Sequence, residues 1–291
     1  MRMRVLLLGE ETLLGQALLA QANLESIQIE SIARPKDGWS IEPVEHVLLQ
    51  QRPDMVINLA FYHEQFQLGL LDADALATQF AFSRSLVDAC AAHEAVMFTP
   101  SSARVFDGLK STAYSERDPV APADPLGVAQ AELEHYQRQV SDEHVILRFS
   151  WLLDRSADGL LGRLLAQIRS GEPVRLAEEW RGNPTPIDDA ARVMLAILKQ
   201  LDCDAPLYGT YHYGSSEVSS WISFAKSLAQ ELLATQQLEA DPVVLPVSFS
   251  EQMMAGREPQ NAALVSRRLL MAFGIKPRAW RAQLGALVRA K

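Results

Sequence analysis

The segment "GEETLLG", residues 9 to 15, has the residue types and spacing that can hold a phosphate group. It lies between an apolar run and a helix-forming run, where backbone N–H groups and the positive end of a helix dipole would face a bound pyrophosphate. Gly9 fits the tight turn of a dinucleotide-binding motif, and Gly15 fits the position of close helix-to-strand packing. Thr12 takes the middle position, where glycine is usual, and two glutamates add negative charge. An ordinary strand-to-helix turn is the alternative interpretation.

The second apolar run is followed by Arg34 and not by an acidic residue. An acidic side chain there would bind the ribose 2′-hydroxyl of NAD, whereas an arginine can pair with the 2′-phosphate of NADP. We therefore expect NADP(H) if a dinucleotide binds; the alternative is a surface cation. The expected cofactor-binding residues are Gly9, Thr12, Leu13, Leu14, Gly15, Arg34 and Ala60.

Three side chains are candidates for proton transfer: Tyr62 and His63, which follow the third apolar run, and Tyr114. None has an obvious lysine partner, so packing contacts are the favoured interpretation. The six histidines form no metal-ligand spacing and no Ser/His/Asp arrangement, and the two cysteines make no disulfide framework. We expect no metal site.

The fold that would position these residues is predicted by short apolar runs that alternate with helical segments. The pattern predicts an α/β fold, a Rossmann-like doubly wound parallel sheet with a smaller α/β substrate lobe. A ligand crevice is expected at the carboxyl ends of the strands. The first domain is expected over residues 1–153, with a return segment at about 186–215 that contains the strand "GTYHYG". The second lobe then takes residues 154–185 and 216–291. The predicted strands of the first domain are 4–9, 27–33, 54–60, 95–102 and 144–150.

Composition narrows the classes of function. The 291 residues carry a net charge of −9, which gives no electrostatic attraction for nucleic acid or for an anionic membrane. The N-terminal apolar stretch is too short for a signal peptide and is better explained as a buried strand. We expect a cytoplasmic protein that has neither nucleic acid nor a membrane as its partner.

Several motifs, in their order and spacing, resemble the extended short-chain dehydrogenase/reductases, specifically the dTDP-4-dehydrorhamnose reductase family. The resemblance covers nearly the whole chain and implies a nucleotide sugar bound between two lobes. The motifs are "LLLGEETLLGQAL", "RPDMVINLA", "SSARVFDG", "YSERDPVAPADPLG", "LRFSWLL", "GNPTPIDDAARVMLAIL", "GTYHYGSSEVSSWISFA" and "REPQNAAL".

The family reduces a sugar ketone with a hydride from the nicotinamide, while a tyrosine donates a proton and a lysine four residues later lowers the pKa of that tyrosine. A serine or threonine on the preceding strand binds the carbonyl oxygen. By this resemblance the serine is Ser102, but Leu126 takes the tyrosine position and Gln130 takes the lysine position. Leucine has no proton to give, and glutamine has no charge with which to shift a pKa.

Other family positions have also changed. Ala103 and Arg104 replace acidic and aromatic residues that approach the substrate, and Phe66 and Gly69 replace an acidic pair. Asp188 is expected to cap a helix. The substrate-binding residues implied by the resemblance are Tyr62, Trp151, Asn183, Thr185 and Arg257, the last of which is displaced by one inserted glutamate.

Three hypotheses follow. The first is a reductase-like protein that no longer reduces and that binds NADP, a nucleotide sugar or both in a regulatory or binding role, with a protein partner or a second copy of itself. The second is an active NADPH-dependent nucleotide-sugar oxidoreductase with a rearranged proton donor. The third is a structural subunit with an empty crevice.

Overall fold

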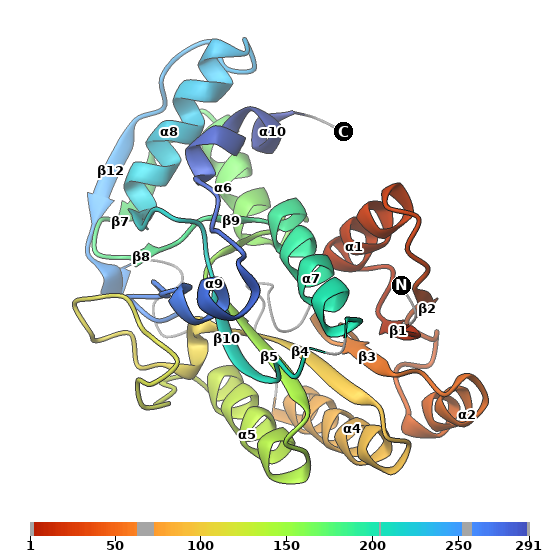
Figure 1. Cartoon of the computed structure of the whole chain (residues 1–291). Helices are drawn as coiled ribbons and strands as arrows, with labels where there is room; N and C mark the ends of the chain where they lie inside the picture. Colours follow the sequence, from red (N-terminus) through yellow and green to blue (C-terminus); the bar gives the residue numbers. More distant parts are fainter. Residues whose placement is uncertain (1–2, 63–72, 204, 252–257, 290–291) are drawn as a thin grey trace.

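A six-stranded, fully parallel sheet forms the centre of the molecule (Figure 1). The structure is a computed structural model that describes residues 3–62, 73–203, 205–251 and 258–289. The strand order is β2-β1-β3-β4-β5-β10, so the chain reverses its direction of winding between β1 and β3. The strands are β1 (Val5–Leu8), β2 (Glu30–Ile32), β3 (Met55–Asn58), β4 (Val96–Ser102), β5 (His144–Phe149) and β10 (Gly209–Tyr213).

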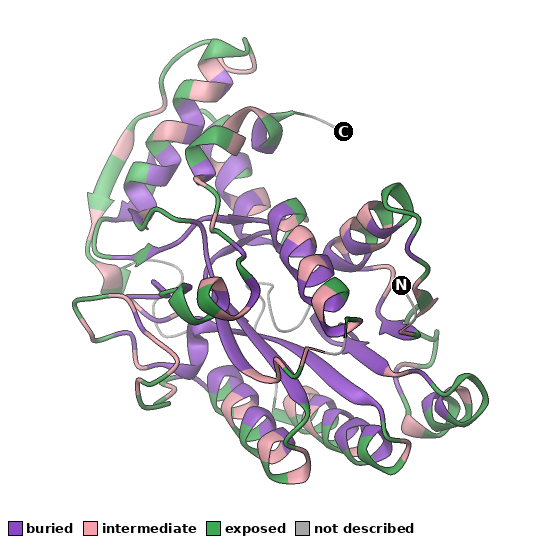
Figure 2. Cartoon of the chain, viewed as in Figure 1, coloured by how far each residue is buried: buried purple, intermediate pink, exposed green. Residues whose placement is uncertain are grey.

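Helices cover both faces of this sheet. On one face, α1 (Leu13–Leu24) and α7 (Ile187–Leu201) pack over the strands. On the other face lie α2 (Ile41–Gln51), α4 (Ala73–Ala92) and α5 (Pro125–Val140) (Figure 1). Except for the edge strand β2, the strands are buried along nearly their whole length, as expected for a parallel sheet that is covered on both faces (Figure 2).

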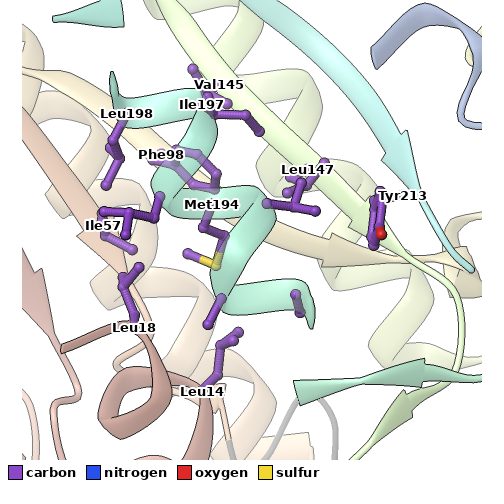
Figure 3. Close-up of a cluster of buried hydrophobic side chains, with 14 of the residues drawn as sticks. Leu14, Leu18, Ile57, Phe98, Val145, Leu147, Met194, Ile197, Leu198 and Tyr213 are labelled. Atoms are coloured by element: carbon purple, nitrogen blue, oxygen red, sulfur yellow. The ribbon is translucent and has the colours of Figure 1, made fainter. Parts of the chain in front are cut away.

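The core under α1 and α7 explains why the N-terminal apolar runs fold together. Figure 3 shows Met194 of α7 between Leu14 and Leu18 of α1 and Ile57 and Phe98 of the sheet. All five side chains are fully buried. Because burying apolar surface is the main favourable term in folding, this cluster fixes where the N-terminus of α1 points.

The second lobe combines short strands with helices around its own apolar cluster. Three two-stranded sheets are present, β6 with β9, β8 with β11 and β7 with β12. Four buried tryptophans anchor the cluster: Trp151, Trp180, Trp221 and Trp280. The short strands are β6 (Leu152–Leu153), β7 (Val174–Ala177), β8 (Arg181–Gly182), β9 (Thr185–Pro186), β11 (Ser219–Ser220) and β12 (Val244–Val247). The helices are α6 (Leu160–Arg169), α8 (Trp221–Ala234) and α10 (Leu284–Val288), and the 3₁₀ turns are η1 (Ala103–Val105), η2 (Phe249–Glu251) and η3 (Trp280–Gln283). Helix α9 (Arg267–Phe273) packs instead on the core of the six-stranded sheet, where Phe273 contacts Tyr211 of β10.

The α/β class and the doubly wound parallel sheet are confirmed, including the return of "GTYHYG" as β10 beside β5. The strand expected over 27–33 is shorter, because only Glu30–Ile32 pairs with β1. The cap expected at Asp188 is wrong. Helix α7 begins at Ile187, so Asp188 lies inside its first turn. We retain the division into residues 1–153 with 186–215, and the remainder, as a proposal. Within the residues the structure describes, no helix is both long and apolar enough to span a membrane.

Candidate functional site

The turn after β1 lies at the switch in winding, beside the turn after β3. Gly9 has φ of +89°, and a Cβ added there would lie 2.4 Å from the carbonyl oxygen of Leu59. At Gly15 an added Cβ would lie 2.5 Å from the carbonyl oxygen of Gly9. Both positions therefore require glycine for the turn itself. This arrangement brings Gly9, Thr12 and Ala60 together at the carboxyl edge, where open α/β sheets bind ligands.

Thr12 caps α1 from inside this turn. Its hydroxyl donates to the carbonyl oxygen of Gly9 over 2.7 Å and accepts from the backbone N–H of Gly15 over 3.0 Å. The side chain therefore takes one of the N–H groups that a phosphate could use. Among the hydrogen bonds of the described residues, none engages the backbone N–H of Leu13 or Leu14. These two groups at the helix N-terminus fit a phosphate oxygen.

The two glutamates of the turn point toward the second strand. The Glu10 carboxylate accepts from the hydroxyl of Ser31, and the Glu11 carboxylate accepts from the backbone N–H of Arg34 over 3.0 Å. The exposed Arg34 side chain lies 5.9 Å from the ring centre of Phe61. Arg34 therefore follows β2 close to the two carboxylates of the β1 turn, where the adenosine ribose of a dinucleotide would lie.

Ser102, at the end of β4, is held by Gln130, the residue that the resemblance assigns to the lysine position. Its hydroxyl donates to Oε1 of Gln130 over 2.6 Å and accepts from the backbone N–H of Arg104 over 3.2 Å. Leu126 is buried one turn earlier on α5. Its backbone N–H and that of Gly127 donate to Asp124, which caps the helix. Leu126 and Gln130 thus lie one turn apart on α5 and line the same small cavity, and Gln130 bonds to Ser102.

This bond is one of four hydrogen bonds that α5 and β4 make among the described residues, and the side-chain amide of Gln137 supplies another by donating to the carbonyl oxygen of Met97 over 2.8 Å. Gln137 accepts from the hydroxyl of Thr99 over 2.8 Å, and Glu134 accepts from the hydroxyl of Ser101 over 2.7 Å. Residues 130, 134 and 137 share one face of the helix because of their spacing. Glu134 also pairs with Arg148 of β5, and both side chains are at most 2% exposed. A buried polar stripe therefore fixes α5 on the sheet.

A second buried ion pair closes the space beside Ser102. The Nε atom of Arg104 lies 2.7 Å from Oε1 of Glu258, and Asp124 lies 3.8 Å from the same guanidinium. The cavity that remains has a volume of about 30 Å³, about that of one water molecule. Its lining includes Ser102, Arg104, Trp151 and Glu258. Burial raises the pKa of the carboxyl groups of Glu258 and Asp124, while Arg104 lowers both.

The other expected substrate-binding residues make internal contacts. Trp151 packs edge-on against Trp180 at 5.2 Å between ring centres. The side chain of Asn183 donates to the carbonyl oxygen of Ser215 and accepts from the backbone N–H of Leu264. The Thr185 hydroxyl donates to the carbonyl oxygen of Asn183. These contacts hold the three side chains in place, and a role in binding substrate stays a prediction. His63, Phe66, Gly69 and Arg257 lie outside the described residues.

The two described tyrosine candidates have unfavourable surroundings for proton donation. Tyr62 is fully buried, and burial together with the neighbouring Asp154 carboxylate raises its pKa. Tyr114 stacks on Phe106 at 4.4 Å between ring centres, and its hydroxyl donates to Asp107 over 2.5 Å. Burial, followed by the bond to Asp107, raises the pKa of Tyr114 to about 12. Both rings are built into the core.

A larger groove of about 810 Å³ lies elsewhere on the second lobe. Its walls come from residues 108–111, the turn at 178–181 and the start of α8, and they include none of the expected site residues. Among the described residues, no group of three His, Cys, Asp or Glu side chains is placed to hold a metal ion.

The partner of Arg104 was not predicted from the sequence. Glu258 was visible only as an inserted residue, and 154 positions separate it from Arg104. The buried polar face of α5 could have been predicted from the sequence. Gln130, Glu134 and Gln137 recur at helical spacing, on a face that is apolar in most buried helices.

The comparisons with known proteins agree with this geometry. The family model described as "RmlD substrate binding domain" matches residues 3–291. A dTDP-4-dehydrorhamnose reductase from Aggregatibacter actinomycetemcomitans is 26% identical over 285 residues, which cover 97% of each chain. The spore coat polysaccharide biosynthesis protein SpsK of Bacillus subtilis is also 26% identical, over 97% of this chain and 95% of its own.

Solved structures show the same fold. A dTDP-4-dehydrorhamnose reductase from Clostridium acetobutylicum superposes with a TM-score of 0.81, with 21% identity and 98% of each chain covered. The corresponding enzyme of Bacillus anthracis, solved in complex with NADP, gives a TM-score of 0.77 and 21% identity, and the match covers 99% of this chain and 98% of that one.

Proposed function

Because the chain belongs to the family described as RmlD substrate binding domain, we propose that it is a reductase-like protein that binds NADP(H), a nucleotide sugar or both, and that does not reduce the sugar. Its role is then one of binding or regulation, exerted through a protein partner or a second copy of the chain. The proposal is carried by one observation, the 2.6 Å bond from Ser102 to Gln130, with Leu126 in place of the proton donor.

The missing reductase activity follows from the chemistry of these positions. Bound NADPH would supply a hydride, and the ketone oxygen would then need a proton. Leu126 has none, and the Ser102 hydroxyl is already engaged with Gln130. A positioned acid commonly contributes about 100-fold to 10,000-fold in rate, so its loss is enough to remove useful turnover.

Binding of the dinucleotide is supported by the turn after β1. The backbone N–H groups of Leu13 and Leu14 would hold the pyrophosphate, and Arg34 would meet the 2′-phosphate of NADP. Thr12 weakens this site because its hydroxyl already binds the N–H of Gly15. Glu10 and Glu11 weaken it further because they add negative charge. The relative from Bacillus anthracis binds NADP on the same fold.

Two measurements test the proposal. In single-turnover assays that follow NADPH absorbance with a dTDP-4-keto sugar, this chain should show no appreciable rate beside the Aggregatibacter reductase. A comparable rate would overturn the proposal and direct attention to Tyr62, His63 and Tyr114. Isothermal titration should favour NADPH over NADH by about tenfold, the value of one hydrogen bond to a charged group.

Arg34→Ala should remove this preference, and Lys36→Ala, at an exposed cation two residues away, should keep it. Equal affinities in the wild type would show that Arg34 has no role in cofactor choice. Absence of binding by either dinucleotide would favour a structural subunit with an empty crevice.

A further inference from the structure

Arg104 and Glu258 form an ion pair between the segment after β4 and the C-terminal part of the chain. The pair lies beside Ser102, where the sugar of a nucleotide sugar would bind. Arg104 follows β4 in η1, and Glu258 belongs to the C-terminal part of the chain. Nε and one terminal nitrogen of Arg104 lie 2.7 and 2.5 Å from Oε1 of Glu258. The two side chains are only 6% and 15% exposed.

Neighbouring contacts hold the pair in position. The backbone N–H of Arg104 donates to Ser102. Gly127 packs so closely that an added Cβ would lie 2.4 Å from the Arg104 carbonyl oxygen. Near Glu258, the backbone N–H of Asn261 donates to the carbonyl oxygen of Gly108 over 3.1 Å. Arg104 therefore projects from backbone that contacts Ser102 and Gly127, and Glu258 lies three residues before backbone that is bonded to Gly108.

The space that remains is too small for a sugar. The cavity beside Ser102 measures about 30 Å³, whereas small-molecule pockets have volumes of about 300 to 1,000 Å³. A sugar ring entering here would have to separate Arg104 from Glu258. Its hydroxyl groups carry no charge to replace either partner, and a buried charge that loses its partner is strongly unfavourable.

We infer that the Arg104–Glu258 pair excludes the sugar of a nucleotide sugar from the pocket beside Ser102, so that the crevice binds the dinucleotide alone. This inference rests on the proposed function and chooses between its two ligands. Arg104 and Glu258 are then specificity-determining residues that act by filling the substrate pocket.

Two double variants test the inference. Arg104→Ala with Glu258→Ala removes both charges together and empties the space, and loss of a whole buried ion pair is tolerated far better than loss of one partner. Arg104→Gln with Glu258→Gln removes the charges but keeps the space filled, and serves as the matched control. Both are titrated with dTDP-glucose by calorimetry and by tryptophan fluorescence, because Trp151 lines the cavity. If circular dichroism shows that the alanine pair is not folded, Arg104→Ser with Glu258→Ser replaces it.

We expect the alanine pair to bind dTDP-glucose at least about tenfold more tightly than the wild type, a difference of about 1.4 kcal/mol. The glutamine pair should bind as weakly as the wild type. Wild-type binding as tight as that of the alanine pair would overturn the inference, and so would an equal gain in the glutamine pair. NADPH is titrated against all variants in parallel. Failure of NADPH binding would refute the proposed binding of NADP(H), while the dTDP-glucose comparison would still decide the role of the pair.

Discussion

Thr12 and Gly15 are joined by a 3.0 Å hydrogen bond from the backbone N–H of the glycine to the hydroxyl of the threonine. The same hydroxyl donates back to the carbonyl oxygen of Gly9, so one side chain closes the turn and caps α1. Thr12 stands where dinucleotide-binding turns usually have glycine. The turn is therefore held together by a group that competes with a phosphate for the helix N-terminus.

Replacing Thr12 should separate the capping role from the effect on binding. Thr12→Ala should lower the free energy of unfolding by about 1 kcal/mol, and Thr12→Ser should change it little. Thr12→Gly should cost only a few tenths of a kcal/mol and should tighten NADPH binding, because it frees the N–H of Gly15. Urea denaturation and calorimetry measure the two effects. Weaker NADPH binding by the glycine variant would show that Thr12 supports the ligand.

Gly9 and Gly38 offer a matched pair of substitutions. Both have φ near +90°, but an added Cβ at Gly38 meets nothing within 4 Å, whereas at Gly9 it meets Leu59. The penalty for the left-handed backbone should be similar in the two alanine variants. Gly9→Ala should therefore be the less stable by about 1 to 3 kcal/mol, the usual cost of overpacking. Thermal melts showing equal losses would mean that the β1 turn can shift.

The buried pair of Glu134 and Arg148 should dominate the stability of α5 on the sheet. Glu134→Ala leaves Arg148 buried without its carboxylate and should cost about 3 to 5 kcal/mol. Arg138 also reaches Glu134, but its side chain is 35% exposed, so Arg138→Ala should cost at most about 1 kcal/mol. Guanidinium denaturation distinguishes the two. Similar losses would show that solvent reaches Glu134.

His212 should make the protein less stable in mild acid. Arg148 can only donate, so Nε2 of His212 accepts its bond at 3.3 Å, and Nδ1 donates to the carbonyl oxygen of Tyr114. Burial, followed by the charge of Arg148, lowers the pKa of His212 to about 3. Below about pH 6.5 the imidazole of His212 therefore binds a proton in the unfolded chain but stays neutral in the folded chain. The free energy of unfolding should fall by up to about 1.4 kcal/mol per pH unit from this group.

His212→Gln should flatten this dependence between pH 7 and pH 5, as measured by denaturant unfolding at each pH. Glu116 acts in the opposite direction, because burial raises the pKa of its carboxyl group. The comparison with the wild type is therefore what isolates His212. The exposed His46, changed to Gln, is the control and should leave the slope unchanged. An unchanged slope in His212→Gln would show that the buried ring is protonated with little cost.

The sequence by itself determined the sheet and the turn that faces its crevice. Apolar runs such as "VLLL" and "MVIN" are long enough for strands and are separated by helical segments, so burial on both faces left only a parallel arrangement. Gly9 and Gly15 could be identified because their roles are local: each avoids a clash with backbone a few residues away or on the neighbouring strand. The assignment of Leu126 and Gln130 to the tyrosine and lysine positions rests on the resemblance and stays a prediction.

Only the tertiary structure decided what those residues do instead. Whether Gln130 faces Ser102 depends on the position and rotation of α5 relative to β4. The buried contacts of Glu134 with Ser101 and Arg148 determine that position. The closing of the sugar pocket depends on Arg104 meeting Glu258, and 154 positions of chain lie between them. Pairing between such distant charges is set by the packing of whole lobes. No local propensity encodes it, because the energy of a buried charge depends on its three-dimensional surroundings.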